Sequence, residues 1–377
     1  MARQSLQIEL AERPKGSIVP GQTFRQRTVA APTEADLKDG QLLLESLYLS
    51  LDPAMRGWLN DRRSYVPPVG IGEVMRGNAI SRVIASKSAK ARAGDIVVAT
   101  IGFREVAILP ETLVEPPFPL PPNGKLTDLL GVLGPTGLTA YFGMTRIGQP
   151  RPGDTVVVSA AAGATGSVAA QIAKISGARV VGTVGSDEKV RWLKEELGLD
   201  EALNYKDPDF KTKFKEATPG YIDVFFDNGR FPYLGGEQLD MALGRAKKNA
   251  RFVMCGGISG YNAESPYGLK ASYSQINISS VIAQRIRMEG FIVFDHIPEY
   301  PAARQQLARW LAEGKIQRKE TVVPGGLAVA EGALSRLFQG GNTGKCSEPV
   351  RRGTESSNFG PGKLLVEVKS PDKVSKL

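Results

Sequence analysis

The chain has 377 residues, which is long for a single hydrophobic core and typical of two domains. Hydrophobic residues make up 42% and charged residues 23%, as in ordinary globular proteins, and no apolar run is long enough to span a membrane. The formal charge of +9 comes from scattered Lys and Arg residues without a recognition motif, so it favours an anionic small-molecule partner over nucleic acid.

Cysteine and histidine are too rare for a zinc site, since the chain contains only Cys255, Cys346 and His296. A structural zinc takes four Cys or His ligands, and a catalytic zinc usually takes three protein ligands drawn largely from them. We therefore expect no metal site, and any redox chemistry must run without zinc. The scarcity of cysteine also favours a reducing compartment, and the first sixteen residues lack the apolar core of a signal peptide.

The first part of the chain, residues 1 to about 130, is predicted to be rich in β-strands. Short apolar segments at 42–44, 97–98 and 106–108 are separated by Gly, Pro and Asp. The proline-rich segment 110–122 is predicted to be a connector that leaves this domain. A helix through Leu129 and Leu133 is predicted to follow.

The stretch 155–189 has the pattern of strand, turn, helix and strand that binds dinucleotides. The turn 161–166 reads AAGATG, so it departs from GxGxxG by an alanine at the first glycine position. The free N–H groups at the start of the following helix suit a pyrophosphate, and only small residues allow the backbone to approach it closely. The alternative is a glycine-bearing turn that binds nothing.

The end of the second strand of this unit distinguishes NADPH from NADH. An NAD site places Asp or Glu there to hold the ribose 2′-OH, whereas this chain has Gly185 and Ser186, followed by Lys189 and Arg191. The two acidic residues at 187–188 fall in the first turn of the next helix, where acids are common. These residues predict NADPH, and the alternative for Lys189 is an ordinary solvated lysine.

From residue 155 onward strands and helices alternate regularly. Strands are predicted at 155–159, 179–184, 201–204, 221–226 and 250–255, with helices at 165–177, 187–197, 208–216 and 234–246. This alternation predicts a doubly wound parallel sheet. A helix at 274–285, a strand at 286–294 and a helix opened by Pro298 should follow. The remainder has strand-and-turn character, ends in a strand at 363–368, and is expected to return to the N-terminal β domain.

Ten short motifs, in order along most of the chain, resemble those of a known enzyme family. They are YLSLDPAMRGW at 48–58, GEVMRG at 72–77, GLTAYFG at 137–143, SAAAGATGSV at 159–168, GSDEK at 185–189, NYK at 204–206, FDNG at 226–229, CGGISGYN at 255–262, GGNTGK at 340–345 and KLLVEV at 363–368. The chain resembles the zinc-independent medium-chain dehydrogenases/reductases of the leukotriene B4 12-hydroxydehydrogenase, prostaglandin reductase and alkenal double-bond reductase group.

The resemblance implies an α/β fold in which a Rossmann doubly wound parallel sheet is inserted in a GroES-like β-rich catalytic domain. The implied domains are residues 1–130 with 312–377 for the GroES-like substrate and catalytic domain, and 131–311 for the NADP-binding Rossmann domain. It also implies NADPH as the cofactor and reduction of a carbon–carbon double bond conjugated to a carbonyl, as in enones and enals.

The resemblance also implies which residues contact the cofactor. By position these are Gly163, Ala164, Thr165 and Gly166 at the pyrophosphate; Lys189 and Tyr205 at the 2′-phosphate; and Asn228, Cys255, Gly256, Gly257, Ile258, Ser259, Gly260, Tyr261, Phe291, Ile292, Val293 and Asn342 around the rest. Cys255 is expected to be a small buried residue rather than a reactive thiol. His296 is expected to be a hydrogen-bonded residue at the rim of the pocket.

Tyr261 is the candidate catalytic residue. Hydride transfer to the β-carbon of an enone leaves negative charge on the carbonyl oxygen, where a hydrogen-bond donor lowers the barrier. Without zinc, a tyrosine hydroxyl or the cofactor ribose must act as this donor, and Tyr261 lies in the loop after the fifth predicted strand. The alternative is a tyrosine that only packs on the nicotinamide.

Two features depart from the family pattern. Many relatives have an aromatic residue at the position of Ala54 within the DPxMR motif, so a larger pocket is expected if that position lines it. The second departure is an excess of eighteen residues, 346–363, which is polar; a Gly-Lys pair precedes it at 344–345 and a second one ends it at 362–363. A retained short intron is one hypothesis for its origin, and a genuine surface loop is the other.

The final residues Ser375, Lys376 and Leu377 form a peroxisomal targeting signal, which predicts an import receptor as a partner and the peroxisome as the location. The alternative is a cytoplasmic enzyme with a fortuitous tail. The family resemblance and the frequency of two-fold assemblies predict a homodimer. A quinone reductase of the same fold, or an NADPH-binding protein without turnover, remains an alternative function.

Overall fold

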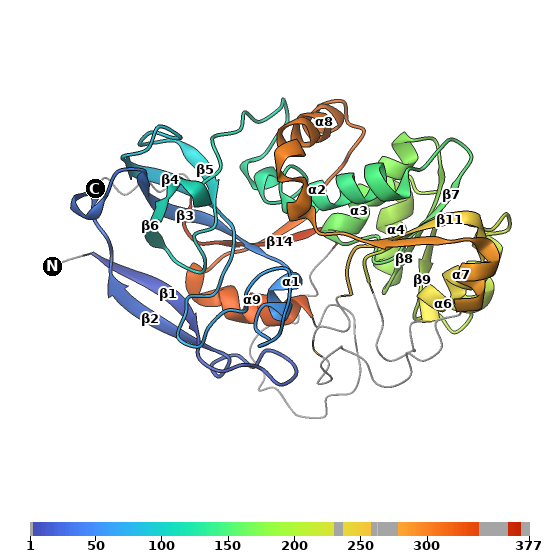
Figure 1. The fold of residues 1–377 in the computed structure, drawn as a ribbon, viewed down its shortest axis with the longest axis horizontal. Coiled ribbons are helices and arrows are strands. Elements are labelled where there is room, and N and C mark those ends of the chain that lie inside the picture. Colours follow the sequence, from blue (N-terminus) through green and yellow to red (C-terminus); the bar gives the residue numbers. More distant parts are fainter. Residues whose placement is uncertain (1–2, 230–236, 258–261, 263–277, 339–360, 371–377) are drawn as a thin grey trace. The chain divides into compact units, whose positions relative to one another are not determined.

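The computed structural model describes residues 3–229, 237–257, 262, 278–338 and 361–370. The chain divides into two compact units (Figure 1). The first comprises Met1–Gly134, Val322–Leu337 and Leu364–Leu377, and the second comprises Pro135–Thr321 and Phe338–Lys363. The second unit is therefore inserted into the sequence of the first.

A six-stranded parallel sheet forms the centre of the second unit, in the order β12-β11-β10-β7-β8-β9. Its strands are β7 (Thr155–Val158), β8 (Arg179–Val184), β9 (Glu201–Asn204), β10 (Ile222–Asp227), β11 (Ala246–Met254) and β12 (Arg287–Gly290). The helices between them are α3 (Ala164–Ile175), α4 (Asp187–Arg191) with its continuation η5 (Trp192–Glu196), α5 (Phe210–Ala217), α6 (Glu237–Gly244) and α7 (Ile278–Gln284). This arrangement confirms the predicted doubly wound parallel sheet.

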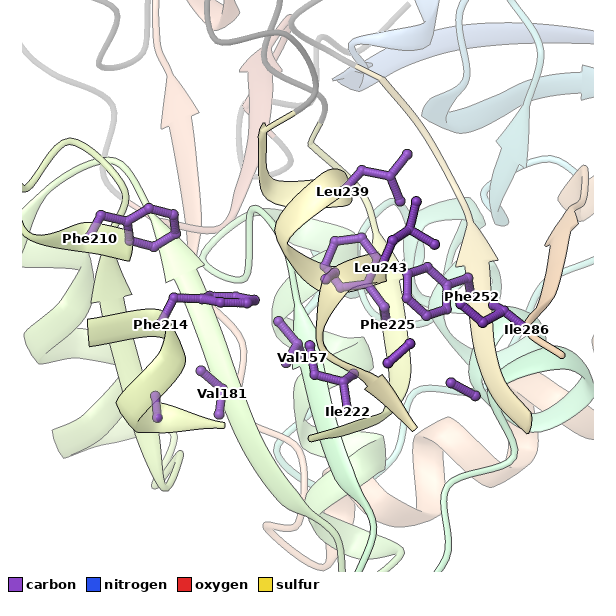
Figure 2. Close-up of a cluster of buried hydrophobic side chains, with 14 residues drawn as sticks. Val157, Val181, Phe210, Phe214, Ile222, Phe225, Leu239, Leu243, Phe252 and Ile286 are labelled. Atoms are coloured by element: carbon purple, nitrogen blue, oxygen red, sulfur yellow. The ribbon is translucent and has the colours of Figure 1, made fainter. Parts of the chain in front are cut away.

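Aromatic side chains fill the core on one face of this sheet (Figure 2). Phe225 of β10 and Phe252 of β11 are fully buried, with ring centroids 5.3 Å apart. Phe214 of α5 packs in the same cluster. Each fully buried Phe contributes about 2–3 kcal/mol of hydrophobic stabilisation. Because both faces are covered at the centre of the sheet, β7 (TVVV) is buried along its whole length, whereas the edge strands β9 (EALN) and β12 (RMEG) are more polar.

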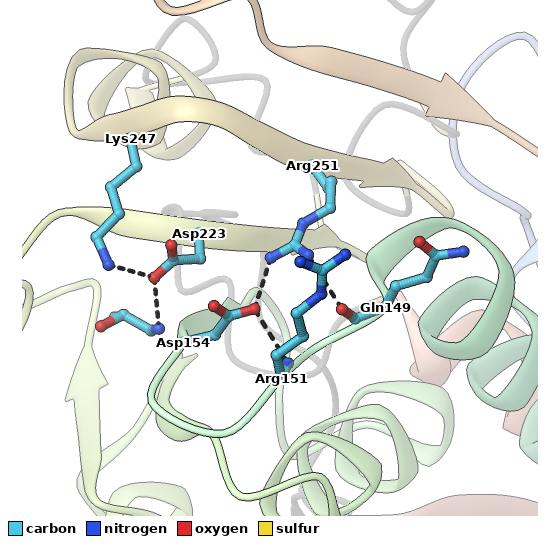
Figure 3. Close-up of polar contacts among 7 residues, drawn as sticks. Gln149, Arg151, Asp154, Asp223, Lys247 and Arg251 are labelled. Carbon is cyan, nitrogen blue, oxygen red and sulfur yellow. Dashed lines mark hydrogen bonds and ion pairs between the residues drawn. The ribbon is translucent and has the colours of Figure 1, made fainter.

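An ionic cluster ties together the segment before β7 and the strands β10 and β11 (Figure 3). The guanidinium of Arg251 lies 2.6 Å from the Asp154 carboxylate, and the Lys247 ammonium lies 2.6 Å from Asp223. Asp223 also accepts a hydrogen bond of 2.8 Å from the backbone N–H of Thr155, the first residue of β7. These contacts fix the register of three strands at the sheet edge opposite their carboxyl ends.

The helices before β7 and after β12 begin later than predicted. The helix expected through Leu129 and Leu133 is wrong, because η3 (Leu126–Leu129) is a short 3-10 helix and α2 begins at Pro135 (Pro135–Phe142). A Cβ at Gly134 would lie 2.4 Å from the Leu129 carbonyl oxygen, so the chain turns tightly there, and proline then starts the helix. α2 is followed directly by η4 (Gly143–Gly148). The helices after β12 are η8 (Val293–Glu299) and α8 (Tyr300–Ala312).

The strand predicted at 286–294 is also too long. β12 ends at Gly290, and η8 is a 3-10 helix that contains Pro298, so α8 begins at Tyr300 rather than at this proline. A short apolar run does not distinguish a strand from a helix. The apolar residues 291–294 do not extend the strand as predicted, because η8 begins among them at Val293.

The first unit is built mainly from antiparallel strands. A second six-stranded sheet has the order β13-β14-β3-β4-β5, with β6 on β3, and β1 pairs with β2 separately. The strands are β1 (Gln4–Leu10), β2 (Phe24–Ala30), β3 (Gln41–Leu51), β4 (Ala79–Ser86), β5 (Ile96–Ala99), β6 (Val106–Pro110), β13 (Glu320–Val323) and β14 (Lys363–Glu367). The helices are η1 (Glu34–Asp36), α1 (Ala54–Gly57), η2 (Glu111–Leu113), η9 (Leu327–Val329) and α9 (Ala330–Leu337).

The C-terminal part of the chain contains more helix than predicted. β14 pairs antiparallel with β3, with Leu364 opposite Leu51, so the final strand joins the N-terminal β sheet as expected. The prediction of strands and turns alone after α8 is wrong, because α9 buries Ala330, Ala333 and Leu334. Its apolar residues follow helical spacing, which was not recognised in so short a segment.

Arg56 holds the DPAMR motif in place. Its side chain is fully buried and donates hydrogen bonds to the carbonyl oxygens of Pro14 (2.9 Å) and Gly16 (2.6 Å) and to Oδ1 of Asn60 (2.8 Å). Burial lowers the pKa of this guanidinium to about 10. Arg56 therefore fastens α1, which begins with Ala54, to the N-terminal segment.

Candidate nucleotide-binding site

The turn between β7 and α3 has the geometry of an anion cradle. A Cβ at Gly166 would lie 2.4 Å from the Ala160 carbonyl oxygen, so only glycine fits at this position. A Cβ at Gly163 would meet nothing closer than 3.3 Å and would otherwise point toward the amide of Asn228, 4.0 Å away. The missing side chain at Gly163 thus leaves room for a ligand at the start of a twelve-residue helix.

Ala160 adopts a left-handed backbone conformation, with φ of 49°, that residues other than glycine rarely occupy. Hydrogen bonds hold the turn in this shape, from Gly163 N–H to the Ala160 carbonyl (3.0 Å) and from Ala161 N–H to the Thr183 carbonyl (3.1 Å). Strain of this kind is maintained by the surrounding structure and concentrates at ligand sites.

The hydroxyl of Ser159 joins this turn to the end of β10. It donates to Oδ1 of Asp227 (3.0 Å) and accepts from the backbone N–H groups of Asn228 (2.9 Å) and Gly229 (3.0 Å). Ser159 is completely buried and Asp227 almost so. Asn228, an expected cofactor contact, therefore lies in a loop whose backbone is anchored by the buried hydroxyl of Ser159.

This arrangement gives a first prediction. Ser159→Ala should lower the free energy of unfolding by about 1–3 kcal/mol, because the partners of the hydroxyl stay buried. It should also raise the NADPH dissociation constant about tenfold, since the Asn228 loop loses its anchor. Chemical denaturation and fluorescence titration measure the two effects.

Thr183→Val is the matched control for this substitution. Thr183 is equally buried on the neighbouring strand β8, and its hydroxyl donates to Gln238 at 2.7 Å. This variant should lose similar stability while keeping its NADPH affinity within about twofold. Equal changes in affinity for both variants would contradict the role of Ser159.

The end of β8 gathers the residues expected to hold a 2′-phosphate. A Cβ at Gly185 would lie 2.3 Å from the Tyr205 hydroxyl oxygen, so glycine is required for this tyrosine to approach. Ser186 caps α4 by accepting from Lys189 N–H (3.4 Å). Burial, with a smaller effect from nearby Lys206, lowers the pKa of Lys189. Burial also raises the pKa of Tyr205 to about 12, so its hydroxyl keeps its proton.

The neighbouring acid Asp187 does not replace the missing NAD-type carboxylate, because its Oδ1 accepts a 2.8 Å hydrogen bond from the Asn204 amide. Glu188 is exposed, and its negative charge partly counteracts the lowering of the Lys189 pKa by burial. The sequence reasoning missed Lys206, although it follows Tyr205 directly in the NYK motif. Two lysines and a neutral hydroxyl therefore lie together, which suits a phosphate dianion.

A cavity of about 450 Å³ lies at the carboxyl ends of β10, β11 and β12. It is lined by Asp227, Met254, Cys255, Gly256, Gly257, Gly290, Phe291, Ile292 and Asp295. Of the residues expected around the cofactor, the cavity brings together Cys255, Gly256, Gly257, Phe291 and Ile292. Ligands of doubly wound sheets bind at this edge, outside the carboxyl ends of the strands.

The expected residues differ in how they contribute to this cavity. Phe291 also packs inward, since a Cβ at Gly143 would lie 2.9 Å from its ring. Val293 begins η8 and does not line the cavity. His296 stacks on Phe142, with ring centroids 4.4 Å apart, and its Nδ1 lies 3.2 Å from Glu299. Asp227 and Asp295 were not among the expected site residues; Asp227 lies in the FDNG motif, whereas no pattern in the sequence distinguishes Asp295 from other acids.

Cys255 is partly buried at the cavity, and its surroundings oppose ionisation of the thiol. Burial, together with the nearby Asp227, raises the pKa of its thiol to about 12, and Sγ donates weakly to Oδ1 of Asn228 at 3.7 Å. At pH 8 only about one such thiol in ten thousand is ionised, and the thiolate is the form that alkylating agents attack.

We therefore predict that native Cys255 resists iodoacetamide at pH 8. The Cys346→Ser variant leaves Cys255 as the single thiol, and mass spectrometry should find it unmodified in the folded protein. The unfolded protein, in which the ordinary thiol pKa returns, should be alkylated at least about a hundredfold faster. Rapid labelling of the folded variant would contradict this prediction.

Several expected site residues lie outside the described part of the chain. They are Ile258, Ser259, Gly260, Tyr261, Asn342 and the residues 346–360 and 375–377. Within the described ranges, no three His, Cys, Asp or Glu side chains are grouped so that they could hold a metal ion. No helix in those ranges is both long and apolar enough to cross a membrane.

The doubly wound sheet, the glycine turn before α3 and the cavity at the carboxyl ends define a dinucleotide-binding oxidoreductase fold. A family model described as "N-terminal domain of oxidoreductase" matches residues 6–116, and one described as "Zinc-binding dehydrogenase" matches residues 164–312. The chain belongs to the medium-chain dehydrogenase/reductase family, in its zinc-independent reductase group.

Individual relatives agree with this assignment. The chain is 38% identical to the NADPH-dependent curcumin reductase of Escherichia coli, over 89% of this chain and 94% of the relative. It is 39% identical to prostaglandin reductase 1 of Bos taurus, over 86% and 96%. The solved structure of CurA from Vibrio vulnificus in complex with NADPH is 36% identical, with a TM-score of 0.80 over 97% of this chain and all of that one.

Proposed function

We propose that the protein is an NADPH-dependent, zinc-independent reductase of carbon–carbon double bonds conjugated to a carbonyl, as in enones and enals. The observation that carries this proposal is the near full-length similarity to reductases named for curcumin and prostaglandin. The site supports it, because Gly185, Lys189 and Tyr205 form a cluster suited to a 2′-phosphate.

NADPH supplies the hydride, and the residues of the chain bind and orient the reactants. The turn at Gly163 to Gly166 would hold the pyrophosphate, and Asn228, the segment 255–260, the residues 291–293 and Asn342 would surround the rest of the cofactor. Tyr261 is proposed to donate a proton to the carbonyl oxygen as negative charge develops there. The family resemblance assigns the GroES-like substrate domain to residues 1–130 and 312–377, and this domain is proposed to have Ala54 in place of a bulkier side chain.

A panel of enals, enones and quinones, followed by NADPH absorbance, tests the proposed reaction. The proposal expects the highest kcat/KM on enals or enones, and Tyr261→Phe should lower kcat more than about a hundredfold with a smaller change in the NADPH dissociation constant. Faster turnover of quinones would indicate a quinone reductase. Tight NADPH binding without turnover of any compound would indicate a non-catalytic protein.

We propose that the enzyme acts in the peroxisome. A chain that ends in Ser375-Lys376-Leu377 carries the tripeptide read by the peroxisomal import receptor. A fluorescent protein fused ahead of the last twelve residues should collect in peroxisomes, and the same fusion without the tripeptide should stay in the cytoplasm. Cytoplasmic fluorescence from both fusions would contradict the proposal.

We further propose a homodimer formed by pairing of β12 with its copy. β12 is an edge strand whose one neighbour among the described strands is β11, and edge strands invite pairing. Arg287 and Glu289 form an ion pair of 2.8 Å within the strand, and antiparallel pairing centred on Met288 would place Arg287 opposite Glu289 of the partner subunit, so the two pairs could join in one network. Light scattering should give the dimer mass, and Met288→Pro should give a monomer; a monomeric unsubstituted protein would contradict the proposal.

A further inference from the structure

The segment that precedes β14 hydrogen-bonds to the nucleotide-binding turn. Gly362 N–H donates to the carbonyl oxygen of Ala162 at 2.8 Å, and Gly362 and Gly163 form an isolated parallel bridge. One residue later, Lys363 N–H donates to the Lys319 carbonyl at 3.0 Å. A residue about two hundred positions downstream thus contacts the glycine turn itself.

The position of Gly362 accepts no other residue. Its φ is 105°, a conformation that side chains disfavour, and a Cβ there would lie 1.9 Å from the Lys319 carbonyl oxygen. The Lys319 segment cannot easily move aside. Gln171 of α3 binds Gln317 twice, accepting from its N–H (2.7 Å) and donating to its carbonyl (2.9 Å).

We propose that Gly362 is a positioning residue for the nucleotide-binding turn. It holds Ala162, and with it Gly163, so that the N–H groups at the start of α3 face the pyrophosphate. This proposal rests on the proposed function, since it assumes that the turn binds NADPH. The hydrogen bond and the steric fit assign this role to the second Gly-Lys pair, at 362–363, rather than to the first, at 344–345.

The repeated pair makes the segment 346–363 removable. Deleting these eighteen residues joins Lys345 directly to Leu364, so that Gly344 and Lys345 take the places of Gly362 and Lys363. The same residue types then precede β14, and the same backbone hydrogen bonds are possible. The long closed loop adds little cost, because the entropy of closing a loop grows only slowly with its length.

Alanine substitutions in the full and the deleted chain test the proposal. Gly362→Ala should weaken NADPH binding at least about tenfold, whereas Gly344→Ala in the full chain should leave it within about twofold. The deleted chain should bind NADPH within about threefold of the full chain, and Gly344→Ala should become damaging in it, again by about tenfold. Fluorescence titration gives the dissociation constants without any need for turnover, and thermal unfolding gives the stability of each protein.

Each outcome decides the matter. Damage by Gly344→Ala in the full chain, with Gly362→Ala harmless, would overturn the assignment, and so would lost stability of Gly362→Ala at unchanged NADPH affinity. If Gly362→Ala does not fold, Gln171→Ala replaces it. This variant frees the Lys319 segment without altering the turn, and unchanged NADPH affinity in it would also overturn the proposal. If the unsubstituted protein binds no NADPH, the proposed function fails. Thermal unfolding of Gly362→Ala and Gly344→Ala would still show which of the two glycines packs against the turn.

Discussion

Replacing Lys189 with alanine is expected to raise the KM for NADPH at least about tenfold while changing the KM for NADH less than about twofold. The 2′-phosphate is the only group that distinguishes the two cofactors, and Lys189 lies with Tyr205 and Lys206 where it would bind. Lys189 is partly buried, so water screens its attraction to the phosphate less than it screens that of a surface lysine. Removing Lys189 should therefore weaken NADPH binding more than removing a surface charge would.

Steady-state kinetics with both cofactors measure the effect of Lys189→Ala. Arg191→Ala is the matched control, because it removes the same charge from an exposed position on the same helix and should change neither KM by more than about twofold. Equal losses with NADPH and NADH in Lys189→Ala would rule out a role at the 2′-phosphate.

The lowered pKa of Lys189 adds a pH dependence to this prediction. Burial favours the neutral amine, and a phosphate dianion favours the charged form. NADPH affinity should therefore fall as the pH rises through the pKa of Lys189 in the free protein, which lies below that of an ordinary lysine. Lys189→Ala should lack this alkaline fall.

Alanine substitutions at Gly166 and Gly163 should affect stability and NADPH affinity differently. At Gly166 the added methyl would overlap the Ala160 carbonyl oxygen at 2.4 Å, so the helix must move away from the strand. We expect Gly166→Ala to lose about 2–4 kcal/mol of stability and more than about a hundredfold in NADPH affinity. At Gly163 the methyl would lie 3.3 Å from the Ala160 carbonyl oxygen, a tight contact that a small shift relieves, and it would otherwise enter the space left for the ligand.

Gly163→Ala should therefore lower NADPH affinity about tenfold or more with less than about 1 kcal/mol lost in stability. Gly244→Ala, at an exposed helical position where a Cβ meets nothing within 4 Å, is the control for glycine replacement and should change neither quantity appreciably. Denaturant unfolding and fluorescence titration of the three variants provide the comparison. A stable Gly166→Ala protein with normal affinity would contradict the steric argument.

The parallel sheet could be predicted from the sequence because its central strands β7, β8 and β10 are buried on both faces. β8 and β9 have the bounds that were predicted, since short apolar runs such as 179–184 are flanked by clear turn residues. The helix before Pro135 and the strand after Gly290 were placed wrongly, because there the backbone is decided by tertiary contacts. Examples are the packing of Gly134 on Leu129 and of the Phe291 ring on Gly143.

The candidate site was predictable only where a residue type has a special backbone or charge role. The glycine turn and Lys189 carry such signals. Asp227, Asp295 and Lys206 do not, because their importance comes from which strands end beside one another. The contact between Gly362 and Ala162 was the hardest to predict, because no sequence pattern near either residue indicates that the two segments meet.

That contact has a consequence for how the protein is made. Synthesis runs from the N-terminus, so the strands β7 to β12 can assemble while the ribosome is still adding the last part of the chain. The turn that would bind NADPH, however, receives its support from Gly362 only after nearly the whole polypeptide has emerged. If Gly362 supports the turn as proposed, a chain terminated before this glycine would contain the strands β7 to β12 but lack the support of the cofactor turn.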